Sequence, residues 1–207
     1  MINKRKDKSV KLKFDQKYFS SGSYKNYKKE VDRWVPYVAW KISKIVRKLP
    51  AKALDVGCAH GYLIAELQNK HNFSVSGIDP SLFAIKNSEP SVRKKISRGN
   101  ILDLPFGKNK FDVVICLGVI NYLKSSDETF AAIKNLVNVS KKYIFFDAIF
   151  KNSWTASQKH NPDKLRNSAL SKKEYVDIFR KNGVKLAQIF DGRNGGTILV
   201  FEKYLKS

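Results

Sequence analysis

Apolar residues along the chain change their spacing several times, and each change predicts a new secondary-structure element. Between Glu30 and Leu49 they recur at helical intervals, which predicts a helix with one buried face. Pro36 should lie in its first turns, where proline is tolerated, and Pro50 should end it. The residues of this face are Trp34, Val38, Ile42, Ile45 and Leu49.

After Pro50, short apolar runs typical of buried strands alternate with helical segments. The runs predict strands at 53–56, 74–78, 96–98, 111–117 and 143–149, with helices at 61–69, 81–87 and 127–139. Ser171 followed by Glu174 is a capping-box pattern, which predicts a helix over 171–182 that Gly183 stops. Residues 184–190 and 197–203 flank the Gly-rich link DGRNGG and suit an antiparallel pair. Together these elements predict an α/β fold, a mainly parallel sheet with helices on both faces.

The chain divides into a short N-terminal part and one domain. Residues 1–28 comprise a basic tail and an aromatic segment, FDQKYFSSGSYKNYK, and residues 29–207 show no repeat or linker that would split them. No apolar run follows the first charges, and no stretch approaches the ~20 apolar residues of a membrane span. Cys58 and Cys116 each end an apolar run, which indicates reduced thiols and a cytoplasmic location rather than a disulfide framework.

The net charge of +22 is unusual and favours an anionic partner. Nucleic acid, a phosphorylated metabolite or an acidic membrane would all satisfy it. The lysines are spread along the whole chain rather than gathered in one block, so a gain in solubility explains the charge equally well.

Two strand ends carry residues suited to a nucleotide-like ligand. In a parallel sheet, ligands bind beyond the carboxyl ends of the strands. Gly57, after the first strand, permits a tight turn, and Asp55 before it could pair with an ammonium group or simply cap the loop. Asp79 ends the second strand, where an acidic residue can accept hydrogen bonds from ribose hydroxyls.

A dinucleotide-dependent dehydrogenase would share these two features but needs G-x-G-x-x-G after the first strand. Here the corresponding residues are Gly57, Ala59 and Tyr62. A tyrosine at the third position would block close packing of the helix on the strand, which counts against NAD.

Four segments, LDVGCAHGYL, GIDPS, GNILDLPF and FDVVICLGVINYL, follow one another in an order and spacing that resemble the motifs of small class I S-adenosylmethionine (SAM)-dependent methyltransferases. The resemblance covers about residues 50–150. It implies a Rossmann-like, seven-stranded sheet whose last strand is antiparallel. It also implies SAM as cofactor and S-adenosyl-L-homocysteine as product.

The resemblance places the methionine end of SAM at the turn after the first strand and the ribose at Asp79. Asn100 and Ile101 would contact adenine, and Leu117 and Gly118 would lie under the methyl group. Aromatic residues before the first motif resemble a flap, which could close on the sulfonium by cation–π contact or only pack the first helix. The cofactor-binding residues it implies are Tyr24, Tyr27, Asp55, Gly57, Cys58, Ala59, Gly61, Asp79, Pro80, Asn100, Ile101, Leu117 and Gly118.

The chain departs from its relatives at Asn121-Tyr122, where many of them read Glu-His. The three histidines also lack the spacing of a ligand set, so we predict no metal. An oxygen or ammonium acceptor needs a base to take its proton. The candidates are His160, Asp147 and Tyr122, in falling order of preference, with an exposed loop histidine and a structural aspartate as the alternatives.

Three functions are open within this family. We expect a small-molecule acceptor, such as a saccharide or an anionic metabolite, because the compact chain and the lack of an appended RNA-binding module favour it over RNA. An RNA acceptor is favoured by the charge, although no N-P-P-Y-type motif follows the fourth strand. A SAM-binding partner protein without catalysis is the third. The oligomeric state is left open.

Overall fold

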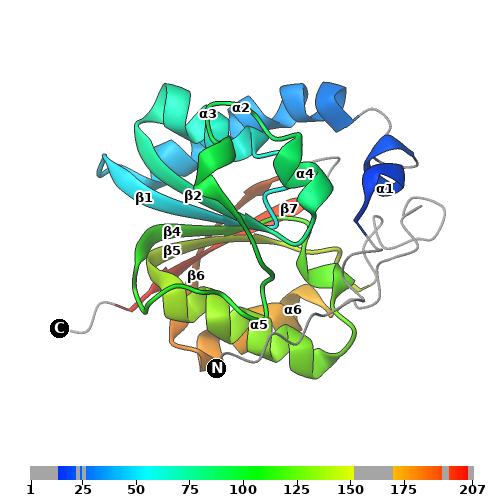
Figure 1. The fold of residues 1–207 in the computed structure, drawn as a ribbon. Coiled ribbons are helices and arrows are strands. Elements are labelled where there is room, and N and C mark those ends of the chain that lie inside the picture. Colours follow the sequence, from blue (N-terminus) through cyan, green and yellow to red (C-terminus); the bar gives the residue numbers. More distant parts are fainter. Residues whose placement is uncertain (1–13, 22–23, 25–26, 152–169, 193–195, 205–207) are drawn as a thin grey trace, which may run out of the picture.

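A computed structural model describes residues 14–21, 24, 27–151, 170–192 and 196–204. Helices and strands alternate along these residues as the sequence predicts (Figure 1). The helices are α1 (Gln16–Ser20), α2 (Tyr27–Val46), α3 (Tyr62–His71), α4 (Leu82–Lys86), α5 (Ser126–Val139) and α6 (Lys172–Lys181). The strands are β1 (Ala51–Val56), β2 (Phe73–Asp79), β3 (Ile96–Arg98), β4 (Phe111–Cys116), β5 (Ser140–Asp147), β6 (Val184–Asp191) and β7 (Thr197–Lys203).

The strands form one seven-stranded sheet in the order β3-β2-β1-β4-β5-β7-β6. The pairs from β3 to β5 are parallel, whereas β7 is antiparallel to both β5 and β6. The Rossmann-like sheet with one antiparallel strand, the last in sequence, is therefore confirmed. The strand order reverses at β1 and β4, which places the ligand-binding switch point at their carboxyl ends.

Side chains that alternate along each strand supply two cores, one on each face of the sheet. Val113 and Ile115 of β4 pack with α2 and α3, and Val114 and Cys116 pack with α5 and α6. Figure 1 shows the same layers, with α2 and α3 above the sheet and α5 and α6 below it. Burial on both faces explains why these strands are almost uninterrupted apolar runs in the sequence.

The first long helix is shifted relative to its predicted bounds. It begins at Tyr27 and ends at Val46, so Pro36 lies in its interior rather than in its first turns, and Pro50 lies beyond its end. Leu49 is exposed and outside the helix, so its inclusion in the buried face was wrong. The residues buried from this helix are Val31, Val35, Val38, Ala39, Ile42 and Val46.

Capping explains where two other helices begin. The Ser81 hydroxyl accepts from the Ala84 N–H, so α4 begins after it. Ser171 and Glu174 form the predicted capping box at α6, and Gly183 follows that helix with φ of 82°. The segment before α2 contains one element that the sequence pattern did not predict, the short helix α1, capped by the Asp15 side chain.

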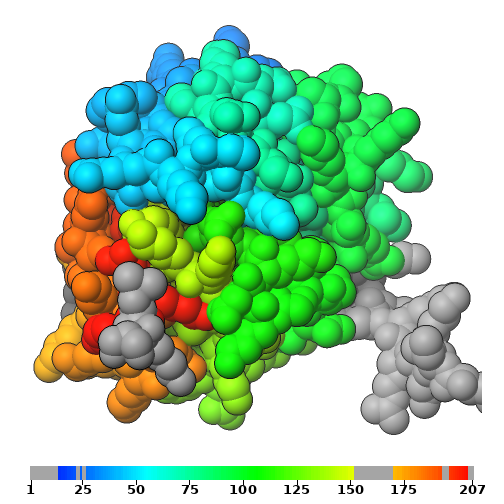
Figure 2. Space-filling model, turned by 90° about the vertical axis from the view of Figure 1, so that its left-hand side faces the viewer, coloured from blue at the N-terminus to red at the C-terminus, as the bar shows by residue number. Residues whose placement is uncertain are grey.

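The two ends of the sheet differ in structure. At the amino ends of the parallel strands, the start of β1, the loop before β4 and the start of β5 lie close together on the surface (Figure 2). At the carboxyl ends lie α1 and the functional site (Figure 1).

Among the described residues, no helix combines the length and the apolar character that crossing a membrane requires. Cys58 and Cys116 are buried free thiols, as expected, and burial raises the pKa of both.

Candidate functional site

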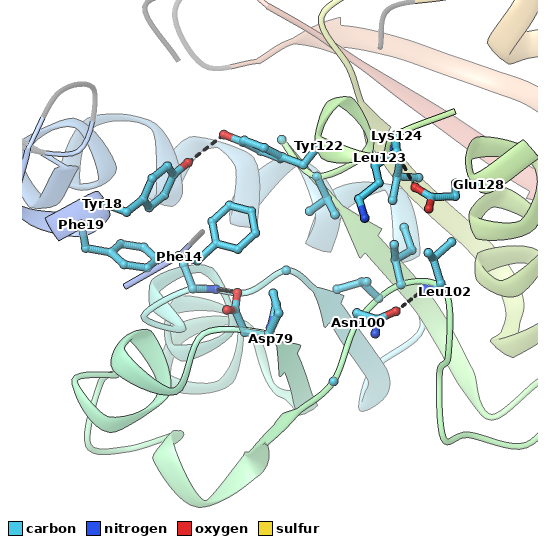
Figure 3. Close-up of a pocket in the computed structure, with 18 of the residues that line it drawn as sticks. Phe14, Tyr18, Phe19, Asp79, Asn100, Leu102, Tyr122, Leu123, Lys124 and Glu128 are labelled. Atoms are coloured by element: carbon cyan, nitrogen blue, oxygen red, sulfur yellow. Dashed lines mark hydrogen bonds between the residues drawn. The ribbon is translucent and has the colours of Figure 1, made fainter. Parts of the chain in front are cut away.

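A cavity of about 200 Å³ lies beyond the carboxyl ends of β1, β2 and β4, at the predicted switch point. Its floor comes from the turn after β1 and from the residues that follow β2, β3 and β4. Its cover comes from the N-terminal segment that contains α1 (Figure 3). The lining is mostly apolar, as expected for a site that takes a flat aromatic group.

Asp79 forms the polar point of this cavity. Its carboxylate accepts from the Ala59 N–H at 2.7 Å and from the Ser81 N–H at 2.8 Å, so it also holds the glycine turn against β2. Burial raises the pKa of Asp79 to about 6, and the two N–H donors oppose the rise. Each carboxylate oxygen has lone pairs left for a ligand hydroxyl.

The turn after β1 requires glycine at position 57. Gly57 has φ of 79°, and a Cβ there would lie 2.3 Å from Cγ2 of Val119. Its N–H donates to the Ile78 carbonyl at 2.7 Å, which ties the turn to β2. The bare backbone lets the loop after β4 pack against the turn, and both segments line the cavity.

A second, smaller and more polar cavity of about 90 Å³ adjoins the first and shares Gly57, Ala59 and Gly118 with it. Asp55 projects from the end of β1 into its lining and is 6% exposed. Burial raises the pKa of Asp55 to about 7, and the nearby charge of Asp79 adds to the rise. A buried carboxylate in a polar cavity suits a cationic ligand group, which would restore its ionised form.

Trp34 brings a donor to the same small cavity from helix α2. Its indole N–H is buried and has no hydrogen-bond partner among the described residues. Because a buried donor without a partner costs about 1–3 kcal/mol, such groups commonly mark a position that a ligand fills. The cavity is therefore lined by Asp55, which can pair with a cationic group, and by Trp34, whose buried N–H has no partner among the described residues.

The N-terminal segment is joined to the loop after β4 by aromatic contacts. The Tyr18 and Tyr122 hydroxyls are 2.9 Å apart, and the Phe14 ring packs edge-on against both tyrosine rings (Figure 3). Burial raises the pKa of Tyr18, so its hydroxyl stays protonated. The Ser81 hydroxyl also donates to the Phe14 carbonyl, which anchors the segment beside Asp79.

Two of the three candidate bases lie at the cavities. Asp147 lines the small cavity and accepts from the Gly118 N–H, and Tyr122 lines the large one. His160 lies outside the described residues. No group of His, Cys, Asp and Glu side chains within the described part of the chain is arranged to hold a metal ion.

Most of the predicted cofactor residues lie at the two cavities, and Gly61 is the exception. It precedes α3 in a left-handed conformation, and its role there is to start the helix. The predicted residues that line a cavity are Tyr24, Tyr27, Asp55, Gly57, Cys58, Ala59, Asp79, Pro80, Asn100, Ile101, Leu117 and Gly118. Asn100 turns its side-chain carbonyl to the Leu102 N–H at 2.8 Å, which leaves one lone pair for a ligand.

Sequence reasoning missed several lining residues. Phe14 and Tyr18 belong to a segment without strong periodicity, and Trp34 was assigned to the core face of its helix. The only available signal was the density of aromatic residues before the first motif. The pairing of Tyr18 with Tyr122 joins residues 104 positions apart, which no local pattern predicts.

Comparison with known proteins relates this chain to methyltransferases. Residues 54–145 match the family model Methyltransf_11, a methyltransferase domain. A tRNA U34 carboxymethyltransferase of Campylobacter fetus is 27% identical over 176 residues, which cover 80% of this chain and 62% of that protein. An uncharacterised protein of Methanocaldococcus jannaschii is 31% identical over 148 residues, 68% of this chain and 61% of that protein. The chain thus spans less than two thirds of either relative.

Among solved structures, magnesium protoporphyrin IX methyltransferase from Synechocystis, crystallised with bound SAH, has a similar fold. The TM-score is 0.68 at 18% identity, and the alignment covers 90% of this chain and 91% of that one. At this identity the likeness concerns the fold.

Proposed function

Because this chain carries a class I SAM-dependent methyltransferase domain, we propose that it binds SAM across the two adjoining cavities and transfers the methyl group to RNA. The observation that carries the cofactor proposal is the small polar cavity. Its buried carboxylate, Asp55, and its unpartnered indole N–H, Trp34, match the ammonium and carboxylate of a methionine end. Asp79 in the larger cavity would accept from the ribose hydroxyls.

The residues of the chain would act mainly by positioning. SAM supplies an activated methyl group, so orientation of the acceptor in line with it provides much of the acceleration. Gly118, whose N–H is fixed by Asp147, lines both cavities and lies where they meet. Asp147 and Tyr122 line this junction from either side, and either could take the acceptor's proton. The aromatic cover formed by Phe14 and Tyr18 would exclude water.

The choice of RNA rests on the relatives and on charge. One relative is named a tRNA U34 carboxymethyltransferase, and the chain carries 40 lysines and arginines against 18 acids. A small-molecule acceptor is the second candidate, because the cavity is small, about 200 Å³, and aromatic side chains cover it. A cytoplasmic location agrees with either acceptor and stays a prediction.

Radiolabelled SAM would test the proposal. The protein is incubated with total small RNA or with a nucleic-acid-free metabolite extract, and the label is followed before and after ribonuclease treatment. We expect acid-precipitable label that ribonuclease releases. Label confined to the metabolite extract would identify the second candidate, and SAM binding without transfer to either would indicate the non-catalytic partner protein.

Replacing Trp34 with phenylalanine should weaken SAM binding about ten- to hundredfold, since one hydrogen bond to a charged group is worth about 1.5–3 kcal/mol. The ring and its packing on α2 remain, so thermal stability should not fall. Calorimetric titration measures the affinity, and Trp40→Phe, the same change on the exposed side of α2, serves as the control. Equal affinities for both variants would remove Trp34 from the site.

A further inference from the structure

The exposed side of α2 carries a surface that the cofactor site does not use. Five of its residues, Arg33, Tyr37, Trp40, Lys41 and Lys44, recur at intervals of three or four positions and so lie on one stripe of the helix. We refer to them as the α2 stripe. It consists of two aromatic side chains flanked by three cationic ones.

The aromatic residues of the α2 stripe are exposed although they are large. Tyr37 is 40% and Trp40 is 44% exposed, and their ring centroids lie 6.4 Å apart. Phe190 of β6 extends the surface, with its ring 6.3 Å from that of Tyr37. Figure 2 shows α2, in blue, next to the dark orange of β6 at the left margin. Adjacent exposed rings of this kind commonly mark an interaction site.

Lys41 holds these rings together. Its ammonium group lies 5.6 Å from the Tyr37 ring, 5.4 Å from the Trp40 ring and 5.8 Å from the Phe190 ring. These distances are within cation–π range, so the three rings are restrained before any ligand arrives. A restrained surface loses less conformational entropy on binding than a mobile one.

From Arg33 onward, α2 and the segment that follows it carry charges of one sign. Between Arg33 and Asp55 the chain contains six basic residues and no acidic one: Arg33, Lys41, Lys44, Arg47, Lys48 and Lys52. Asp32, before the stripe, is paired with Lys28, and Asp191 is the acidic residue next to Phe190 on β6. The stripe is therefore complementary to a polyanion that also carries flat rings.

We propose that the α2 stripe, with Phe190, binds single-stranded RNA by stacking bases on Trp40 and Tyr37 and by pairing phosphates with the adjacent cations. Bases stack on aromatic side chains independently of sequence, and a basic groove follows the backbone. From Arg33 to Lys44 the helix rises about 16 Å, the length of about five nucleotides at ~3.4 Å each. This inference rests on the proposed RNA acceptor and specifies where flanking nucleotides would lie.

The stripe is placed to serve the methyl-transfer site. Trp34, one residue beyond Arg33, lines the small cavity, and Phe190 pairs in the sheet with Ile198, which lines the same cavity. RNA held on the stripe would therefore run beside the cavity, from which an unstacked acceptor nucleotide could enter the site.

Fluorescence anisotropy with a fluorescein-labelled 12-nucleotide oligouridylate tests the inference. We expect Trp40→Ala to weaken binding about tenfold. Phe130→Ala, which removes an equally exposed ring from α5 on the other face, should leave binding within about twofold. Lys44→Gln should lower the slope of log affinity against log salt by about 0.7, whereas Lys134→Gln on α5 should lower it less.

Calorimetry with S-adenosylhomocysteine on the same variants separates the two proposals. If the wild-type protein binds S-adenosylhomocysteine, and Trp40→Ala and Phe130→Ala bind the oligonucleotide equally, the stripe is excluded and the proposed cofactor remains. If the wild-type protein does not bind S-adenosylhomocysteine, the proposed function fails instead. Sedimentation adds one outcome: a dimer that Trp40→Ala dissociates, with RNA affinity unchanged, would assign the stripe to self-association and overturn the inference.

Discussion

Changing Asp79 to asparagine should reduce the affinity for SAM on the order of a hundredfold. The proposed ribose contacts are two hydrogen bonds to a carboxylate, each worth about 1.5–3 kcal/mol, and an amide offers one oxygen in place of two. That oxygen is needed by the protein itself, since Asp79 accepts from both the Ala59 and Ser81 N–H groups. In the variant, almost no acceptor therefore remains for the ribose hydroxyls.

The same change should leave the protein folded. One of the two N–H groups loses its partner, which costs about 1–3 kcal/mol, but the buried charge that raises the pKa of Asp79 to about 6 disappears as well. Calorimetry with SAM and thermal unfolding would be measured on the same sample. Asp103→Asn is the control, because Asp103 lies in the loop after β3 and is exposed. A folded Asp79→Asn protein with wild-type affinity would refute the ribose assignment.

Much of the fold could be predicted from the sequence because its strands are buried. Strands such as β4, covered on both faces, are apolar throughout, so their positions follow from the sequence alone. Helix α2 was placed less well: it has the predicted length of 20 residues, but it begins and ends three residues earlier than its apolar pattern suggests. Pro36 lies on its exposed side, so it interrupts the backbone pairing without disturbing the buried face.

The site was predictable where it depends on the backbone. Gly57 and Asp79 act through a tight turn and a strand end, and both features leave marks in the local sequence. The role of Trp34 left no such mark in the sequence. At the edge of the apolar face of α2, a tryptophan that only packs and a tryptophan that donates to a ligand occur at the same spacing. Contacts between distant segments, such as that of Tyr18 with Tyr122, depend on how the N-terminal segment packs against the loop after β4. No local pattern in the sequence predicts them.

Changing Asp55 to asparagine should stabilise the ligand-free protein in alkaline solution. Burial raises the pKa of Asp55 from 3.8 to about 7, so the folded state holds its proton more tightly than the unfolded state. Stability is therefore highest below about pH 4 with respect to this group, falls as the pH rises to 7, and stays low above it. The loss amounts to a few kcal/mol, on the order of 1.4 for each pKa unit. Asparagine cannot ionise, so the variant does not lose this stability as the pH rises.

Urea unfolding at pH 8 and pH 5 would measure this effect. At pH 8 we expect Asp55→Asn to raise the free energy of unfolding by about 2 kcal/mol or more, and at pH 5 the gain should shrink, because Asp55 is then mostly protonated. Asp103→Asn, an exposed site, should change neither value by more than about 0.5 kcal/mol. An equal gain at both pH values would mean that Asp55 is ionised throughout.

The same proton should make SAM binding depend on pH. The ammonium of SAM would pair with ionised Asp55, so below pH 7 binding must release a proton, and affinity should fall about tenfold for each pH unit from 7 toward 6. Below 6, protonation of Asp79 should steepen the fall. Asp55→Asn should bind SAM weakly at pH 8 and lose the dependence between 7 and 6. Calorimetry at pH 6.5 in two buffers of different ionisation enthalpy counts the protons released on binding. A count for the wild type that exceeds the count for the variant by about three quarters of a proton would place the ammonium at Asp55, whereas equal counts would place it elsewhere.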